Sequence, residues 1–247
     1  MSSSRSQRLR SLIALPAHSS DWEFTSVLIS RPLNFLLLHL VGDVAWITPN
    51  LVTLLGFASF LCASWLIAFH PVHLAAISLL LFARLILDDL DGMMARYRGG
   101  GSKLGSYLDK TTDVIGFFLF FSALGYRSAI ALNQGWYPWI AHVATFSLLT
   151  TGYVKWVVHS FEPPESAQPE KPAATSIPKR PWYKIFAILL FLKLPALNEC
   201  DIFPLAIILL LLGKPHWLLW VLATTQVFQM LAMVIIRGAR AHALDRK

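Results

Sequence analysis

The sequence predicts an all-α integral membrane protein, with six transmembrane helices and an N-terminal amphipathic helix that lies in the membrane interface. Of its 247 residues, 55% are hydrophobic and only 14% are charged, whereas soluble domains carry roughly 25% charged residues. The mean hydropathy is +0.56, and several apolar runs approach or reach the length of about 20 residues that crosses the hydrocarbon core. This composition excludes an ordinary soluble domain.

Residues 31–46 precede the first long apolar run and are predicted to form the interfacial helix. Three consecutive leucines begin at Leu36, but Pro32, Asn34 and Asp43 are among the residues that interrupt the apolar pattern. A helix that lies in the interface fits this mixture better than a seventh span does.

Six apolar segments follow and are the predicted spans. They cover residues 50–70, 72–91, 104–125, 136–158, 201–213 and 216–236. The fifth is short for a span unless it begins earlier. Between the fourth and fifth spans, residues 160–181 contain six prolines and are predicted to be a disordered linker. Residues 182–194 are predicted to be a second interfacial helix or a re-entrant segment.

The basic residues are distributed unevenly between the two sets of loops. One set holds only Arg127 and Lys214, whereas the other set and the two termini hold eighteen of the 21 lysines and arginines. Basic residues collect in cytoplasmic loops, so both termini are predicted to be cytoplasmic. This asymmetry also explains the net charge of +7 without nucleic-acid binding, for which the chain offers no soluble domain.

The predicted organisation follows from these assignments. It comprises a cytoplasmic tail and interfacial helix over residues 1–47, a six-span transmembrane domain over residues 48–240, and a cytoplasmic tail over residues 241–247. The two cysteines, Cys62 and Cys200, have no partner at metal-ligand spacing, and no disulfide is expected between them.

Four aspartates lie where the second span ends and the third begins: Asp88, Asp91, Asp109 and Asp113. Charge at membrane depth is costly and usually marks an ion, proton or substrate site. Residues three or four apart share a helix face, and the glycine-rich connection at 98–103 permits a tight reversal. The two helices are therefore predicted to be antiparallel neighbours whose four carboxylates converge.

Four carboxylates this close cannot all stay ionised unaided, so either some hold protons or cations neutralise them. A cluster of carboxylates alone suits magnesium, manganese or calcium. Two such ions would form a clamp for phosphoryl displacement. Gly92, Ala95 and Gly105 would let a ligand approach the helices closely, and the guanidinium of Arg96 could grip a diphosphate.

These residues resemble the signature of the CDP-alcohol phosphotransferases, also called CDP-alcohol phosphatidyltransferases. That signature reads Asp-x-x-Asp-Gly-x-x-Ala-Arg, then eight residues, then Gly-x-x-x-Asp-x-x-x-Asp. The matching residues are Asp88, Asp91, Gly92, Ala95, Arg96, Gly105, Asp109 and Asp113. Upstream, Pro49, Asn50 and Thr53 are similar to the family's Pro-Asn-x-x-Thr sequence.

The resemblance implies an enzyme that cleaves the diphosphate of a CDP-linked alcohol, passes one half to an acceptor hydroxyl and releases CMP. It implies that Asp88, Asp91 and Asp109 hold two divalent ions of Mg²⁺ or Mn²⁺. It implies that Asp113 is the general base and also a metal ligand. Residues at the CDP site would be Gly92, Ala95, Arg96 and Gly105.

The resemblance further implies six spans, a cytoplasmic active site in the inner membrane, and a homodimer. The favoured donor is CDP-diacylglycerol and the favoured acceptor a small polyol or polyol phosphate, in phospholipid synthesis. A CDP-choline or CDP-ethanolamine transferase and an inositol-phosphate-type transferase of the same family remain alternatives.

An alternative from another class is a cation- or proton-coupled transporter, since such proteins also keep acids within the membrane. Two observations oppose it: the acids lie at one membrane face, and no internal repeat is visible.

Several other charged residues have two possible roles. Arg84 is expected to pair with a motif aspartate at i,i+4 spacing or to bind phosphate. Asp89 is expected to be solvated or paired with lysine. Lys155 is either an acceptor-binding residue or an ordinary snorkelling lysine.

Two further groups have simpler interpretations. Lys179, Arg180 and Lys184 are expected to bind anionic lipid head groups. Glu199 and Asp201 are expected to stabilise a helix N-terminus through its dipole.

Overall fold

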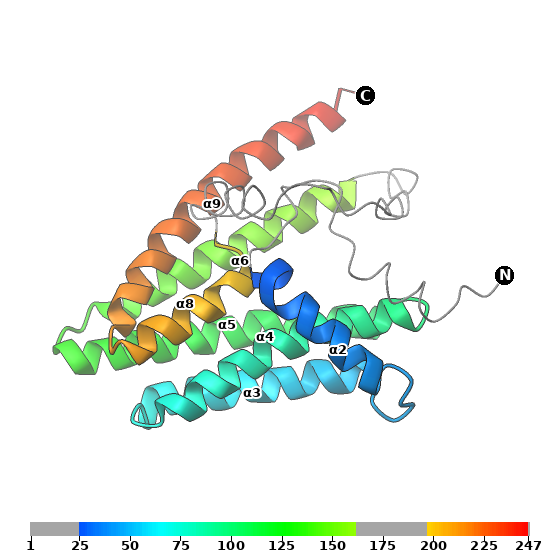
Figure 1. The fold of residues 1–247 in the computed structure, drawn as a ribbon. Coiled ribbons are helices and arrows are strands. Elements are labelled where there is room, and N and C mark those ends of the chain that lie inside the picture. Colours follow the sequence, from blue (N-terminus) through cyan, green and yellow to red (C-terminus); the bar gives the residue numbers. More distant parts are fainter. Residues whose placement is uncertain (1–24, 162–196, 247) are drawn as a thin grey trace, which may run out of the picture.

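The computed structural model describes residues 25–161 and 197–246, and within these ranges every regular element is a helix (Figure 1). The elements are the π-helical η2 Ser26–Ser30, α2 Arg31–Val41, α3 Pro49–Phe69, α4 Leu74–Tyr97, α5 Lys103–Leu132, α6 Tyr137–Phe161, α8 Glu199–Leu211 and α9 Pro215–Leu244. The predicted all-α class is confirmed for this part of the chain. Almost all of the predicted linker at 160–181 and all of the segment at 182–194 lie outside the described residues.

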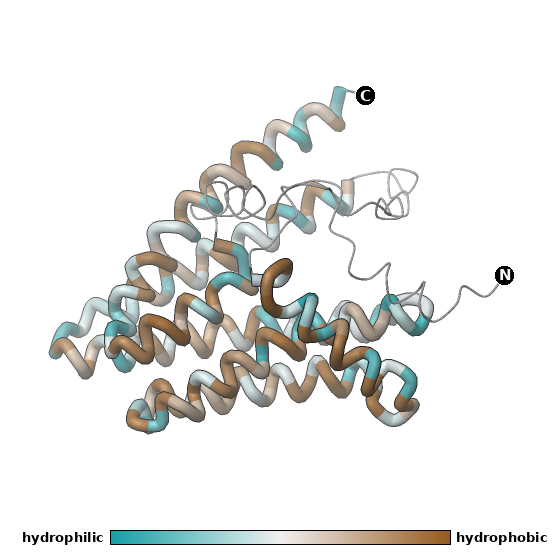
Figure 2. The backbone as a smooth tube through the Cα atoms, in the orientation of Figure 1, coloured by the Kyte–Doolittle hydropathy of each residue, from teal (hydrophilic) through white to brown (hydrophobic). Residues whose placement is uncertain are grey.

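Three helices, α3, α5 and α9, are long and apolar enough to cross a membrane. In Figure 2 the hydrophobic stretches follow the helices, and hydrophilic residues are more frequent at their ends. This supports an integral membrane protein. The count of six spans stays a prediction, because α8 has only 13 residues and α4 carries several charges along its second half.

Each predicted span coincides with a helix, but three helices continue well past the predicted ends, and α9 reaches Leu244 although the sixth span was predicted to end at 236. The second span was predicted to end at 91, whereas α4 continues to Tyr97; the third was predicted to end at 125, whereas α5 continues to Leu132. A hydropathy pattern stops at the first charged or polar group. The helix continues beyond it because its backbone hydrogen bonds are satisfied internally, and α5 ends only where Asn133 adopts a left-handed conformation, with φ of 51°.

Side-chain caps fix the start of two helices that border the site. Thr48 accepts a hydrogen bond from Leu51 N at 3.2 Å, with Pro49 in the first turn of α3. Ser102 accepts one from Gly105 N at 2.9 Å at the start of α5. Such caps satisfy backbone N–H groups that the first turn leaves unpaired.

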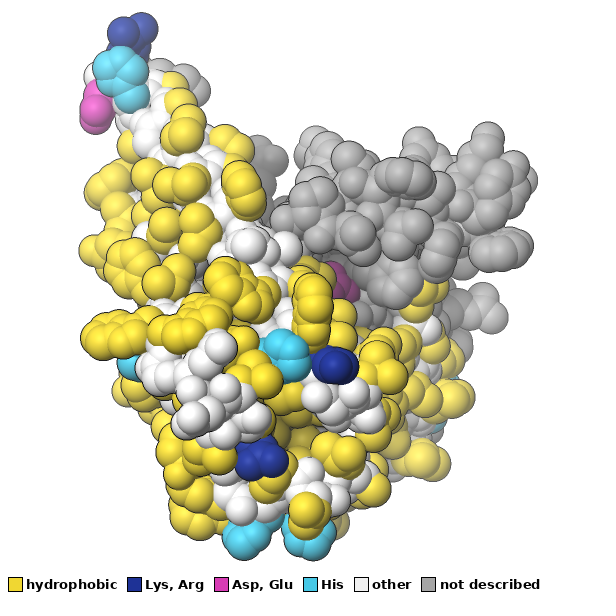
Figure 3. Space-filling model, turned by 90° about the vertical axis from the view of Figure 1, so that its left-hand side faces the viewer, with side chains coloured by type: hydrophobic (Ala, Val, Ile, Leu, Met, Phe, Trp, Pro, Cys, Tyr) yellow, Lys and Arg dark blue, Asp and Glu magenta, His cyan; other side chains and the backbone are white. Residues whose placement is uncertain are grey.

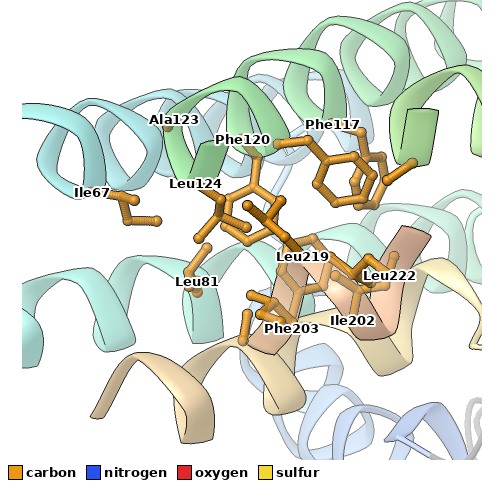
Figure 4. Packing of buried hydrophobic residues seen from close by; sticks show 14 of the residues in the cluster. Ile67, Leu81, Phe117, Phe120, Ala123, Leu124, Ile202, Phe203, Leu219 and Leu222 are labelled. Atoms are coloured by element: carbon orange, nitrogen blue, oxygen red, sulfur yellow. The ribbon is translucent and has the colours of Figure 1, made fainter. Parts of the chain in front are cut away.

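The helices pack in a connected bundle in which α3 contacts both α4 and α5, and α6 contacts both α5 and α9. The prediction that α4 and α5 are antiparallel neighbours is confirmed by their side chains, because Arg84 of α4 pairs with Asp113 of α5, although the two backbones are not among the closely packed pairs. Large side chains, including Leu81 of α4 and Phe120 of α5, stand between them in the core (Figure 4). The two helices nevertheless run in opposite directions and are joined by a short loop (Figure 1).

A cluster of phenylalanines forms the centre of the core. The ring of Phe60 lies 5.3 Å from those of Phe117 and Phe120 and 5.2 Å from that of Phe203. Gly116 leaves room for this ring, since a Cβ there would lie only 2.5 Å from a Phe60 ring carbon. Edge-to-face contacts of this kind add to the stabilisation that burial provides.

The N-terminal helical segment, η2 with α2, has a buried polar side and an exposed apolar side. Asn34 Nδ2 donates to Ile86 O at 2.9 Å, and the Ser30 hydroxyl donates to the carboxylate of Asp89. Leu36 and Leu40 point outward with most of their surface exposed. Such a distribution suits a helix whose outer face meets lipid.

This segment corrects two expectations. The helix ends at Val41, whereas the prediction extended it to 46, because Gly42 and Asp43 open the loop to α3. Asp89 is neither fully solvated nor paired with lysine, because the hydroxyl of Ser30 is its partner.

The loops α3–α4, α5–α6 and α8–α9 gather at one end of the bundle, opposite the loops α2–α3 and α4–α5 (Figure 1). Figure 3 faces the first of these ends, where hydrophobic side chains cover most of the surface and basic ones are few. The aspartates lie toward the opposite end, near the α4–α5 loop. The acidic cluster therefore lies nearer to the α4–α5 loop than to the opposite end, with Asp109 in the second turn of α5 and with Asp88 and Asp113 deeper along their helices.

Candidate metal and nucleotide site

Three of the four predicted carboxylates come together between α4 and α5. Oxygen atoms of Asp88, Asp109 and Asp113 all lie within 4.8 Å of one another. Asp91 is outside this group of three. Within the described residues, the cluster contains only carboxylate ligands, which is the donor set that hard divalent cations prefer. The residues present therefore fit magnesium or manganese.

Asp91 is held separately, by a residue of α3. The Thr53 hydroxyl donates to Asp91 Oδ2 at 2.5 Å, and the Asp91 side chain is 7% exposed. Thr53 lies in the first turns of α3, whose N-terminus is fixed by the Thr48 cap. The orientation of Asp91 therefore depends on α3 as well as on its own helix.

Arg84 lies beneath the cluster and pairs with two of its carboxylates. Its Nη1 is 2.8 Å from Asp88 Oδ1, and its Nη2 donates to Asp113 Oδ1. The side chain is 1% exposed, and its guanidinium carbon lies 5.7 Å from the centre of the Phe60 ring. The predicted i,i+4 ion pair is confirmed, and the structure adds Asp113 as a second partner.

Beside the carboxylates lies a cavity of about 450 Å³. Its lining consists of Thr48, Pro49, Asn50, Thr53, Asp91, Gly92, Ala95, Arg96, Arg98, Gly100, Gly101, Ser102, Gly105, Ser106 and Asp109. All four residues predicted at the CDP site belong to this lining. Asp91 and Asp109 line it too, whereas Asp88 and Asp113 are not among the lining residues.

Gly105 makes one wall of this cavity possible. A Cβ at this position would lie 3.0 Å from Asn50 Oδ1 and 3.1 Å from Ser102 Oγ. A larger residue would push these polar side chains aside. The glycine therefore lets the N-termini of α3 and α5 approach each other at the cavity.

Residues 46–200 match the CDP-alcohol phosphatidyltransferase family. The chain belongs to this family. Family members are transferases of substituted phosphate groups, so the predicted family and enzyme class are confirmed. The match covers both signature aspartate pairs and the upstream Pro-Asn-x-x-Thr sequence.

Curated relatives carry related names. The chain is 36% identical over 128 residues to a phosphatidylinositol phosphate synthase of Mycobacteroides abscessus, covering 51% of this chain and 53% of the relative. It is 45% identical over 67 residues to an archaetidylinositol phosphate synthase of Pyrococcus horikoshii, covering 27% of this chain and 35% of the relative. The chain thus matches about half the length of the first relative.

A solved structure is also similar. It is the crystal structure of Mycobacterium tuberculosis phosphatidylinositol phosphate synthase with CDP-DAG bound. The TM-score is 0.42 and the sequence identity 21%, with 77% of this chain and 93% of that chain covered.

The cavity lining includes residues that the sequence did not single out. Arg98, Gly100, Gly101, Ser102 and Ser106 line the cavity. The glycine run was interpreted only as a reversal, and it does reverse the chain, with φ of 102° at Gly99 and 133° at Gly100. Its position between two motif segments was the signal that it also borders the cavity.

A second contact layer ties the α2–α3 loop to the end of α4. Arg98 Nε donates to Gly42 O at 3.0 Å and its Nη2 to Val44 O at 2.9 Å. The Tyr97 hydroxyl donates to Asp43 Oδ1 at 2.8 Å. Sequence patterns do not reveal these contacts, because the partners are more than fifty positions apart.

Of the other charged residues with a predicted role, those that the structure describes are not among the cavity-lining residues. Lys155 is exposed on α6, whereas Lys179, Arg180 and Lys184 are outside the described residues. Glu199 and Asp201 lie in the first turn of α8, as predicted, and Asp201 Oδ1 also accepts a hydrogen bond from Thr25 N at 2.8 Å. Cys62 and Cys200 are not joined by a disulfide in the described part of the chain.

Proposed function

We propose that this protein is a metal-dependent phosphatidyltransferase that moves the phosphatidyl group of CDP-diacylglycerol to a hydroxyl of an inositol phosphate and releases CMP. The observation that carries the proposal is the placement of four motif carboxylates beside a cavity that contains every predicted CDP-site residue. The relatives named phosphatidylinositol phosphate synthase and archaetidylinositol phosphate synthase support an inositol phosphate lipid as the product.

In this proposal Asp88, Asp91, Asp109 and Asp113 hold two divalent ions. When bound, these ions would polarise the diphosphate and stabilise charge on departing CMP. The fit rests on the carboxylate-only cluster and on the cavity-facing position of Asp91 and Asp109.

Asp113 is the proposed general base. The acceptor hydroxyl oxygen attacks the phosphorus that carries the diacylglycerol, and its proton passes to the carboxylate. The phosphorus–oxygen bond to CMP breaks, and CMP leaves with the bonding electrons. A positioned base contributes typically about 10²–10⁴-fold to such a rate, and Arg84 holds this carboxylate in one orientation.

Arg96 and the small residues would bind the nucleotide half of the donor. Gly92 lies directly next to the Arg96 guanidinium, since a Cβ on Gly92 would be 3.4 Å from Nη1. Ala95 and Gly105 also line the cavity, and their small size leaves room there for a ligand. A guanidinium beside a cavity of this kind can bind a diphosphate through two hydrogen bonds.

The proposed setting is the inner membrane, with six spans, cytoplasmic termini and a cytoplasmic active site, in a homodimer. The charge asymmetry of the loops supports the orientation. A site near the end of the bundle can receive a water-soluble acceptor and a lipid donor together.

The proposal is tested by identifying the product. Purified protein is incubated with CDP-diacylglycerol, Mg²⁺ or Mn²⁺, and separately with inositol phosphate, inositol or glycerol phosphate; lipids are identified by mass spectrometry and CMP is quantified. We expect a phosphatidylinositol phosphate and an equal amount of CMP, and neither with Asp113→Asn. CMP release with another acceptor alone would refute the inositol assignment.

The same preparation tests the transporter alternative. Substrate-dependent flux across proteoliposomes without CMP release would favour a transporter and refute the transferase. The structure offers no support for that alternative, since Asp109 lies in the second turn of α5, near the end of the bundle. Transporter sites typically lie near the bilayer midplane.

A further inference from the structure

Arg84 is the largest fully buried side chain among the described residues and lies in direct contact with the carboxylate cluster. It is not among the residues that line the cavity. A substrate in the cavity therefore meets Asp91 and Asp109 at the wall, while Arg84 reaches the two carboxylates that do not line it, Asp88 and Asp113. The four aspartates thus form two pairs in different surroundings.

The slot that holds the guanidinium is shaped from three helices. A Cβ on Gly56 of α3 would lie 3.3 Å from Arg84 Nη1, so a larger residue there would crowd the guanidinium. The Phe60 ring, also from α3, lies on the other side at cation–π distance. Asp113 comes from α5. Arg84 of α4 therefore contacts residues of both α3 and α5 next to the carboxylate cluster.

A planar guanidinium can bind two carboxylates at once through different nitrogen atoms, as Arg84 does with Nη1 and Nη2. A buried carboxylate without a partner is strongly unfavourable. Before any divalent ion is bound, the arginine is thus the cation that compensates Asp88 and Asp113. The same positive charge opposes an ion that approaches these carboxylates.

We propose that Arg84 is the counter-ion of this carboxylate cluster. It is a positioning residue that holds Asp88 and Asp113 in place before a metal ion binds. Its positive charge also lowers the affinity of the cluster for the metal ion. The inference rests on the proposed function in so far as it takes the cluster to be a metal site. It goes beyond that function because it assigns to Arg84, which does not line the cavity, an effect on metal affinity and on the stability of the metal-free site.

The test compares Arg84→Met and Arg84→Lys with wild type, by thermal unfolding of the full chain in detergent with EDTA and with Mn²⁺, and by Mn²⁺ titration. In EDTA, Arg84→Met should unfold at least about 5 °C below wild type, because two buried carboxylates lose their cation. In Mn²⁺ most of this loss should be recovered. Removing the opposing charge should tighten Mn²⁺ binding about tenfold.

Arg84→Lys separates charge from geometry. Lysine keeps the positive charge but cannot bind two carboxylates in the same planar arrangement. We expect its Mn²⁺ affinity to stay within about threefold of wild type, and its turnover to fall at least about tenfold because Asp113 is no longer held. Wild-type turnover with this variant would overturn the positioning role, even if Arg84→Met fails to fold.

Leu81→Ala is the matched control. Leu81 is fully buried on the same helix, three positions before Arg84, and carries no charge. It should lower the unfolding temperature equally with EDTA and with Mn²⁺. If Arg84→Met shows the same pattern as this control, or an unchanged Mn²⁺ affinity, Arg84 is not a counter-ion of the centre.

Product formation by wild type is measured in parallel. A wild type that makes product while the Arg84 variants behave like the control overturns this inference and leaves the proposed function standing. A wild type that makes no product, but whose Arg84→Met variant binds Mn²⁺ more tightly, refutes the function and retains the counter-ion.

Discussion

Asp113 is in contact with Arg84 and within reach of Asp88 and Asp109, yet it does not line the cavity. Asp113→Asn keeps the shape and the contact with Arg84 but cannot accept the acceptor proton. We expect turnover to fall about 10²–10⁴-fold, with CDP binding in the presence of Mn²⁺ largely retained. Turnover is measured by CMP release, and CDP binding is measured by calorimetric titration. An equal loss of metal affinity would make Asp113 an ordinary ligand.

Thr53 has a role that its position in the sequence alone did not reveal. Thr53→Val removes the hydroxyl that holds Asp91 while keeping the volume of the side chain. Since a hydrogen bond to a charged group contributes about 1.5–3 kcal/mol, we expect Mn²⁺-dependent CDP binding to weaken about tenfold or more.

Ser64→Ala is the control for this variant. Ser64 lies on the same helix and is buried, but its hydroxyl donates only to Phe60 O, at 2.8 Å. It should leave CDP binding unchanged. Unaltered CDP binding in Thr53→Val would show that Asp91 does not need α3 for its orientation.

At the residue scale, the sequence predicted the motif residues well, because fixed spacing on a helix determines which side chains share a face. It did not predict the partners that come from other helices. Asp91 and Thr53 are brought together by the packing of α3 on α4, and Arg84 reaches Asp113 across the bundle. Such contacts depend on helix packing, which a local spacing pattern does not specify.

At the scale of elements, the α2–α3 loop depends on Arg98. Arg98 donates to two carbonyls of this loop, Gly42 O and Val44 O, and the loop leads directly into the cavity residues Thr48 and Pro49. Arg98→Ala should loosen the loop, raise KM for the CDP-linked donor several-fold and change kcat less. Hydrogen exchange of residues 42–48 should increase in the same variant.

Arg127→Ala is a suitable comparison, because Arg127 lies toward the opposite end of the bundle on α5. It should change neither KM nor hydrogen exchange in the loop. If hydrogen exchange of residues 42–48 in Arg98→Ala equals that of wild type, the hydrogen bond between Tyr97 and Asp43 holds the loop and Arg98 is not needed.

The elements themselves were largely predictable. Apolar runs of sufficient length marked every long helix, and turn residues marked the loops. The ends were less accurate, as α4 and α5 show, because a helix can continue through polar residues that the hydropathy pattern excludes. The buried polar side of η2 and α2 was not anticipated, since it is explained only by the partners Asp89 and Ile86 on α4.

For the whole molecule, the proposed orientation places the α8–α9 loop outside and the C-terminus inside. Lys214 and Arg246 are exposed at these two places. Lys214→Cys should react with a membrane-impermeant thiol reagent in intact cells, whereas Arg246→Cys should react only after permeabilisation. Wild type is the control for Cys62, which is exposed on α3. The reverse labelling pattern would contradict the cytoplasmic active site.

The central claim is that the carboxylates of α4 and α5 hold divalent ions beside a bound nucleotide. Crystals grown with Mn²⁺ and CDP, measured at the manganese absorption edge, test it most directly. We expect anomalous peaks among Asp88, Asp91, Asp109 and Asp113, with the CDP diphosphate next to them in the cavity. Well-ordered CDP in this cavity without manganese at the carboxylates, or manganese bound only elsewhere, would contradict it.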